Sequence, residues 1–265
     1  MGKKRGLKKL VGPHGFSGMD GGGILIDGFQ HRAAMTMMNY NYFYYRKLVE
    51  ENGFNKLKDY YSALLETEKF TLPEKIKRSL KFQRRGAFFG YLNLRVKKQV
   101  KKIAKEIGKV YNESFVSHDD FCPLTEKEIE MLTKNLTLVS KSFPLKILYY
   151  KDEIAGFLFA FPDLSRALQK AKGRLNPLTI LNIASEMRKT NYLIINGAGI
   201  LPKFQKMGGN AVLYYKLEQT IKSEGKKYKF SDLTQIAEIT TLMLKDLKTL
   251  DSSIYKTHRV YACDL

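Results

Sequence analysis

The stretch that decides the fold runs from residue 197 to residue 211 and reads GAGILPKFQKMGGNA. It ends the apolar run of residues 192–200, which is typical of a strand, and it opens a segment with helically spaced apolar residues. The start of a helix presents backbone N–H groups and the positive end of the helix dipole, which suits a pyrophosphate. Gly208 and Gly209 leave room for backbone to approach phosphates, and Lys203 and Lys206 add positive charge beside them. The stretch therefore predicts an anion-binding turn between a strand and a helix.

The flanking sequence predicts the elements around this turn. Before it we expect a strand at 87–92, helices at 96–110 and 125–139, strands at 145–150 and 154–161, and helices at 164–171 and 178–188. After it we expect a strand at 228–233, a helix at 238–249 and a strand at 254–263. Thr125 and Glu128 have the spacing of a capping box. This order predicts a mixed α/β fold whose first half is largely antiparallel.

The amino-terminal part is separated by a basic connector. Its pattern predicts a helix at 40–52, with Tyr40, Phe43, Tyr44 and Leu48 on one face, and a strand at 56–65. Residues 67–85 are polar and basic. We therefore expect a partial module at 1–66, a linker at 67–85 and a complete domain at 86–265.

Residues 86–265 resemble the GNAT acyltransferase superfamily, whose cofactor loop reads Gln/Arg-x-x-Gly-x-Gly/Ala. Gln205 and Gly208 match this loop, whereas Asn210 stands where the family prefers Gly or Ala. The whole chain further resembles bacterial proteins with two such modules in tandem, through residues 10–15, 24–28, 44–54, 111–113, 123–125, 161–164 and 254–261.

The resemblance implies a GNAT fold and the use of acetyl-CoA or another acyl-CoA. It implies that backbone groups of Gly199 and Ile200 pair with the pantetheine arm of the cofactor. It also implies that the turn holds the pyrophosphate through Gln205, Lys206, Met207, Gly208, Gly209, Asn210 and Ala211. The acceptor that the resemblance implies is an amine of unknown identity.

The catalytic groups depart from the family pattern. Members often use a Tyr on the last helix as an acid, but Leu247 stands there and residues 238–250 contain no Tyr. A Glu is also absent from residues 192–200, where a base is frequent. Asp232, Gln235 and Glu238 are the candidates left, and each also reads as a capping or solvated polar residue. Positioning and oxyanion contacts alone can carry much of such catalysis.

The amino terminus suggests a second hypothesis. Residues 7–66 resemble only the last strand-helix-strand portion of a GNAT module, so we expect that the first half of that module is missing. Such a fragment exposes sheet edges and favours pairing into oligomers or aggregates.

Composition and net charge limit the functions and partners that the chain can have. The formal net charge of +20 attracts anionic partners, and it is the only direct support for a nucleic-acid partner. The two cysteines and four scattered histidines form no metal-ligand pattern, and no apolar run is long enough for a membrane span, so we expect a cytoplasmic protein without a metal. The leading interpretation is an acyl-CoA-dependent N-acyltransferase. The alternatives are a non-catalytic module that binds CoA or a partner, and a nucleic-acid-associated protein.

Overall fold

The computed structural model describes residues 2–15, 21–34, 38–68, 70–86, 89–94, 97–115, 122–139, 145–174, 176–225 and 227–265. The chain divides into two compact units. Unit 1 comprises residues 1–65, 164–183 and 232–265, and unit 2 comprises residues 66–163 and 184–231. Both units therefore combine segments that are distant in the sequence, and the module boundaries expected at residues 66 and 86 stay a prediction.

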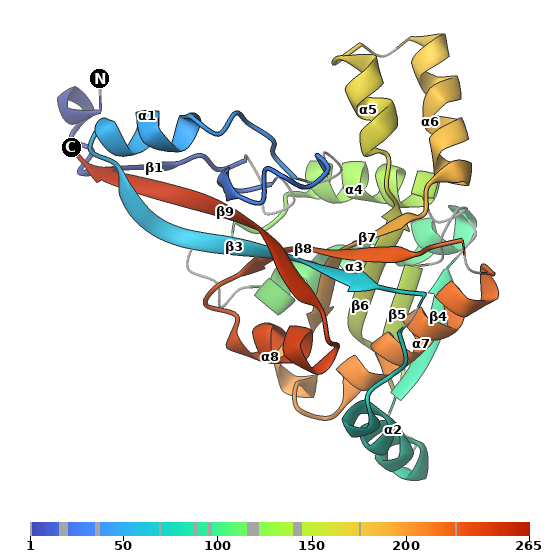
Figure 1. Cartoon of the computed structure of the whole chain (residues 1–265). Helices are drawn as coiled ribbons and strands as arrows, with labels where there is room; N and C mark the ends of the chain where they lie inside the picture. Colours follow the sequence, from blue (N-terminus) through green and yellow to red (C-terminus); the bar gives the residue numbers. More distant parts are fainter. Residues whose placement is uncertain are drawn as a thin grey trace. The chain divides into compact units, whose positions relative to one another are not determined.

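Unit 2 is built on an antiparallel sheet of four strands in the order β4-β5-β6-β7 (Figure 1). The strands are β4 (Phe89–Leu94), β5 (Leu145–Tyr150), β6 (Glu153–Pro162) and β7 (Tyr192–Ile200). The hairpin of β5 and β6 and the bounds of β7 agree with the sequence pattern. Strand β6 reads as an almost unbroken apolar run because it is central in this sheet and buried along most of its length.

Helices cover both faces of this sheet. They are α2 (Glu74–Gly86), α3 (Lys97–Phe115), α4 (Glu126–Val139) and α7 (Gly209–Ser223). A Cβ built on Gly199 meets Ser114 of α3, whereas Ile200 lies against Gly209 of α7. Since neighbouring strand residues point to opposite faces, α3 and α7 lie on opposite sides of β7. Helix α4 begins with the expected capping box, in which Thr125 and Glu128 exchange hydrogen bonds.

Unit 1 contains a second group of strands in the order β1-β9-β3-β8, with β2 also paired to β9. They are β1 (Lys9–Gly12), β2 (Ile24–Asp27), β3 (Asn55–Glu66), β8 (Phe230–Ala237) and β9 (Ser253–Asp264). Strand β9 pairs antiparallel with β1, β2 and β3, which makes it the centre of this group. The sequence pattern predicts that β8 ends at residue 233, which is four residues before its observed end.

The helices of unit 1 are short: α1 (Tyr45–Glu51), α5 (Ser165–Ala171), the first part of α6 (Pro177–Lys189) and α8 (Thr241–Thr249). The helix expected from residue 40 begins only at Tyr45. The reason is a contact with β2, because the Asn41 side chain accepts a hydrogen bond from the Leu25 N–H at 2.7 Å and donates to the Leu25 carbonyl at 3.1 Å. These bonds hold residue 41 against β2, outside a helix.

The aromatic side chains expected on one helix face lie before α1, since Tyr40, Phe43 and Tyr44 precede its first residue. Tyr42 and Phe43 are 66 % and 73 % exposed, and α1 has no buried residue. In the described parts of the chain, no helix combines the length and the apolar character that a membrane crossing requires.

Candidate cofactor and catalytic sites

Strand β7 carries a bulge shortly before its end. Ala198 faces Leu158 and Ile195 faces Ala160, so Phe159 of β6 opposes two residues of β7, Asn196 and Gly197. Gly197 has a φ of 101°, in the left-handed region that favours glycine. A bulge of this kind bends the strand and re-aims its backbone groups. The residues of β7 at and after the bulge can therefore direct N–H and carbonyl groups away from the regular ladder of hydrogen bonds.

The strand leaves the sheet through a tight connection. The Leu201 N–H donates to the Ala155 carbonyl at 2.9 Å, and the short helix η2 (Pro202–Phe204) follows. The Gln205 side chain then donates from Nε2 to the Ile200 carbonyl at 3.1 Å. Gln205 thus closes the turn onto the end of β7. This hydrogen bond is a structural reason for a Gln at the first position of the Gln-x-x-Gly pattern.

Two residues just before α7 have a left-handed backbone conformation. Lys206 and Gly208 have φ values of 62° and 84°, both left-handed. Gly208 is the residue before the helix and has no side chain with which to cap it. The N terminus of α7 is therefore available to a ligand with negative charge, in the manner of helix N-terminal anion sites.

Gly209 has a packing role that the sequence did not indicate. A Cβ at this position would lie 2.7 Å from Cδ2 of Leu148 and 3.0 Å from Cδ1 of Ile200. These atoms belong to β5 and β7, so the glycine lets the first turn of α7 press directly on the sheet. The sequence predicts a small residue here for phosphate access, but tight helix–sheet contact explains it without a ligand.

The residues predicted to bind the cofactor come together in unit 2. Gly199 and Ile200 end β7, Gln205 closes the turn, and Asn210 is exposed in the first turn of α7. Lys206 is exposed, Met207 is half-buried, and Ala211 is buried against the sheet side of the helix. The second lysine of the turn, Lys203, forms an ion pair with Glu153, which offsets part of its charge.

An aromatic cluster lies beneath the end of β7 on the side of α3. Phe157 stacks on Phe159 with ring centroids 4.5 Å apart, and Tyr111 and Phe115 of α3 pack against Phe157. In the same place Ser114 is only 9 % exposed, and its Oγ has no hydrogen-bond partner in the part of the chain that the structure describes. A buried hydroxyl without a partner is costly unless a ligand or water satisfies it. The sequence contained no signal for Ser114, because one serine in a helix is unremarkable.

The two proposed bases lie in unit 1. Asp232 is fully buried in β8 and accepts a hydrogen bond from the hydroxyl of Tyr255. The Tyr255 hydroxyl also accepts a hydrogen bond from Lys256 Nζ at 3.2 Å, and Nζ donates to the Arg32 carbonyl at 2.7 Å. Asp232 therefore lies in a buried cluster of polar groups that includes a tyrosine from β9, which the sequence did not identify.

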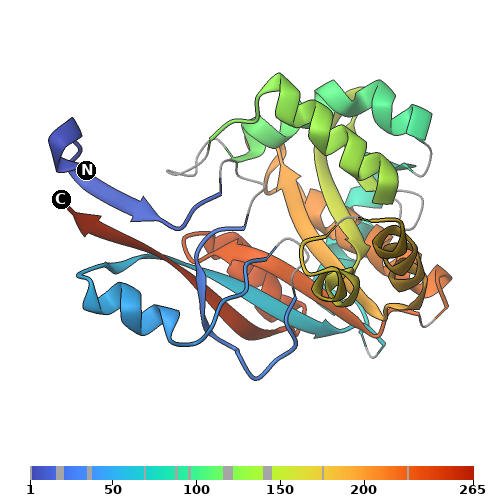
Figure 2. The same cartoon turned by 90° about the horizontal axis from the view of Figure 1, so that it is seen from above.

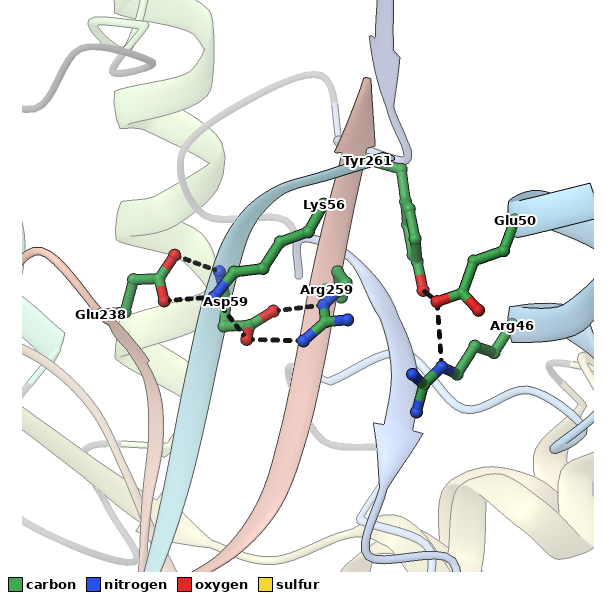
Figure 3. Close-up of polar contacts among 7 residues, drawn as sticks. All are labelled: Arg46, Glu50, Lys56, Asp59, Glu238, Arg259 and Tyr261. Atoms are coloured by element: carbon green, nitrogen blue, oxygen red, sulfur yellow. Dashed lines mark hydrogen bonds and ion pairs between the residues drawn. The ribbon is translucent and has the colours of Figure 1, made fainter. Parts of the chain in front are cut away.

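Glu238 and Gln235 have structural contacts (Figure 3 shows those of Glu238). Glu238 Oε2 accepts from Lys56 Nζ at 2.7 Å, and its Oε1 accepts from the Asp59 N–H at 3.0 Å. The Gln235 amide bonds both the N–H and the carbonyl of Gly22, at 3.0 and 3.1 Å. Leu247, which stands where the family often has a tyrosine, is buried in α8.

A network of charges surrounds these contacts in unit 1 (Figure 3). Arg259 donates two bonds to Asp59, at 2.7 and 2.9 Å, and Lys56 lies 2.9 Å from the same carboxylate. Burial raises the pKa of Asp59, but the bonds from Arg259 and Lys56 outweigh it and hold the pKa below its ordinary value. The network joins β3, β9 and the end of β8, so it stabilises the fold of unit 1.

No protein-family model matches this chain. Among curated proteins, it is 24 % identical to the bacterial ceramide synthase of Caulobacter vibrioides over 98 % of this chain and 67 % of the relative. It is 20 % identical to protein YghO of Escherichia coli over 98 % of this chain and 66 % of that protein. The chain thus spans about two thirds of the length of both relatives.

Solved structures share the fold. A tandem GNAT protein from the clavulanic acid biosynthesis pathway superposes with a TM-score of 0.54 at 9 % identity, over 99 % of this chain and 66 % of that one. A GCN5-related N-acetyltransferase of Sphaerobacter thermophilus gives a TM-score of 0.50 at 9 % identity, over 86 % and 59 % of the two chains. The mixed α/β fold is therefore that of the GCN5-related N-acetyltransferases, as the sequence predicted. Nothing in these likenesses bears out the missing half-module.

Proposed function

We propose that this protein is an acyl-CoA-dependent N-acyltransferase whose CoA site lies at the end of β7 and the start of α7. The observation that carries the proposal is the sequence of a bulged strand end, a closed turn and an uncapped helix N terminus within one unit. The fold shared with N-acetyltransferases and the relative named ceramide synthase support it.

The residues present fit the phosphates of a CoA thioester. The left-handed backbone at Gly208 leads directly into α7, and no side chain at that position covers the helix start. Backbone N–H groups of Gly209 and Asn210 would hold the pyrophosphate, with the helix dipole adding to the attraction, whereas the Ala211 N–H donates to the Gly208 carbonyl at 3.1 Å. Backbone groups of Gly199 and Ile200 would pair with the pantetheine arm.

Acyl-CoA supplies an activated carbonyl that an amine can attack. The chain positions the thioester and stabilises the charge that develops on it. The bulge at Asn196 and Gly197 re-aims strand N–H groups, which can stabilise negative charge on the carbonyl oxygen. We propose that the Ser114 hydroxyl, buried beside Gly199, finds its missing partner in the bound thioester.

The contacts rank the two carboxylates that are candidates for the general base. Glu238 is the weaker one, because both of its oxygens already accept hydrogen bonds from Lys56 and Asp59. Asp232 is bonded to the Tyr255 hydroxyl, a group that can pass a proton. We therefore propose Asp232, acting with Tyr255, before Glu238.

The acceptor is proposed to be an amine of a lipid. Ceramide is an amide of a fatty acid with a long-chain amino alcohol, so a ceramide synthase forms the kind of bond that an N-acyltransferase forms. The sequence favoured acetyl transfer, and the same relative makes a long-chain acyl group the second donor to examine.

The proposal is tested by release of free CoA thiol from acetyl-CoA and palmitoyl-CoA in the presence of small amines and a long-chain amino alcohol. We expect amine-dependent release by the wild-type protein. Ser114→Ala should lower kcat/KM by about tenfold, as expected for one lost hydrogen bond to the reacting group, without lowering the Tm. Failure of every donor–amine pair, with CoA still bound, would support the non-catalytic alternative, which the absence of a tyrosine from α8 favours.

A further inference from the structure

Helix α6 carries its apolar residues on the outside. Leu178, Ile180 and Leu181 are 70 %, 57 % and 66 % exposed, while the polar residue between them, Thr179, is buried. At about 100° per residue, these three side chains and Pro177 fall within one arc of about 160°. The first turn and a half of α6 therefore has the reverse of the pattern expected for a surface helix. We call Leu178, Ile180 and Leu181 the aliphatic tip.

The aliphatic tip is held in place by a well-bonded turn. The Thr179 N–H donates to Asn176 Oδ1 at 2.8 Å, which caps the helix, and the Thr179 hydroxyl donates to the Arg174 carbonyl at 3.1 Å. The Arg174 N–H in turn donates to the Ala171 carbonyl at the end of α5, at 2.9 Å. Figures 1 and 2 show α5 and α6 side by side, joined by this turn. The exposure of the aliphatic tip is thus a property of a folded element.

Positive charge accompanies the aliphatic tip. Between Asp163 and Glu186 the sequence contains no acidic residue and four basic ones, all exposed: Arg166, Lys170, Lys172 and Arg174. The last three lie in or beside the turn. Helix α1 also exposes apolar side chains, but Arg46 and Lys47 there are ion-paired with Glu50 and Glu51. The α5–α6 turn thus joins exposed aliphatic side chains with an excess of cations. Residues 3–11 of unit 1 do so as well, with Leu7, Leu10 and Val11 exposed among five basic residues, but there the aliphatic side chains lie on a strand and the loop before it and not on a helix face.

We propose that the aliphatic tip and the cations of the α5–α6 turn form a docking site for an anionic phospholipid bilayer. A nucleic acid would use the cations but leave three aliphatic side chains in water. A bilayer surface uses both, because aliphatic side chains enter the acyl region while Lys and Arg reach the headgroups. The proposal stands independently of acyl transfer, and it explains how such a protein would reach a lipid acceptor.

Because the chain contains no Trp, the fluorescence of a single introduced Trp directly reports insertion into a bilayer. A Leu178→Trp variant of the full chain carries a single tryptophan in the aliphatic tip, and Leu242→Trp places one at an exposed leucine of α8 as the matched control. With vesicles of phosphatidylcholine and phosphatidylglycerol, we expect a blue shift and quenching by brominated lipid for Leu178→Trp only. No shift at residue 178, or an equal shift at residue 242, would overturn the proposal.

A second measurement separates docking from the overall charge. Co-sedimentation with the same vesicles should weaken about twenty-fivefold in Lys172→Glu/Arg174→Glu, at about fivefold per cation near an anionic surface. Lys245→Glu/Lys248→Glu makes the same change in net charge on exposed residues of α8 and should lose far less. Leu178→Gln/Leu181→Gln should weaken binding about tenfold, against little change for Ile239→Gln/Leu242→Gln. Equal losses in the two charge-reversed variants would mean that only the net charge of the chain acts, and equal losses in the two glutamine variants would mean that the aliphatic tip does not enter the bilayer; either result would overturn the proposal.

Discussion

The turn between β7 and α7 and the network that joins β3, β8 and β9 are stabilised in different ways. The turn depends on close contact: Gly209 sits against Leu148 and Ile200, and one side-chain amide, that of Gln205, closes it. The network depends on charge, with Asp59 between Arg259 and Lys56. The contrast teaches that small residues can shape one turn by close packing alone, while another part of the chain holds its strands together by pairing its own charges.

The largest effect is expected from breaking the charge network. Asp59→Asn leaves Arg259 without its carboxylate and Lys56 with that of Glu238 alone, in a place where the side chains of Asp59 and Arg259 are only 6 % and 18 % exposed. We expect a loss of about 3 kcal/mol in the free energy of unfolding in urea, typical of removing one partner from a buried pair.

The matched control is Lys47→Gln, which breaks an exposed ion pair of α1 whose side chains are 75 % and 59 % exposed. Little change is expected there. If Asp59→Asn destabilises the protein no more than this control, the network contributes nothing and the contrast between the two regions fails.

A smaller effect is expected from crowding the turn. Gly209→Ala adds a Cβ within 3 Å of Leu148, and overpacking of this kind costs about 1–3 kcal/mol, partly offset by the better helix propensity of Ala. Gly90→Ala in β4 is the control, because its Cβ would have Tyr149 as its nearest neighbour at 3.8 Å. Urea unfolding of both variants decides the matter: a Gly209→Ala variant as stable as Gly90→Ala would show that the helix does not need this close approach.

The smallest effect concerns pH. Burial lowers the pKa of His258, which contacts the Asn39 carbonyl through Nε2 at 3.0 Å. In the unfolded chain, His258 therefore binds a proton near the ordinary pKa of about 6.5. In the folded chain, the His258 side chain stays neutral at that pH. Stability should fall as the pH drops through this value toward the lower folded pKa. His258→Gln should remove that part of the slope in unfolding experiments between neutral and mildly acidic pH, and an unchanged slope would contradict the assignment.

The two regions also differ in how far the sequence predicted them. The strand at residues 192–200 and the capping box of Thr125 and Glu128 are local patterns, and the structure confirms both. The turn was predicted because its glycines and Gln205 lie within a few residues of the strand end. The role of Gly209 in packing was missed, because its neighbour Leu148 is far away in the sequence.

The network could not be predicted by such reasoning. Its members meet only when three strands assemble, and no spacing in the sequence indicates this contact. They are Lys56, Asp59, Glu238 and Arg259. The sequence suggests Glu238 as a base because it follows a strand, but its two oxygens accept hydrogen bonds from Lys56 and Asp59 of β3. The helix predicted from residue 40 begins late for a similar reason, because the contact of Asn41 with Leu25 in β2 decides where α1 begins.

The central claim, that the start of α7 holds the phosphates of CoA, is tested most directly by calorimetric titration of acetyl-CoA into two variants and the wild type. Asn210→Glu places a negative charge in the exposed first turn of α7 without backbone strain, whereas Gly208 is left-handed and cannot be replaced so cleanly. Gln219→Glu makes the same change of charge farther along the same helix, at another exposed position. We expect micromolar binding by the wild type and by Gln219→Glu, and a loss of at least about tenfold in Asn210→Glu with an undiminished Tm, since Glu suits the first turn of a helix. Equal affinity in Asn210→Glu, or no binding by the folded wild-type protein, would contradict the claim.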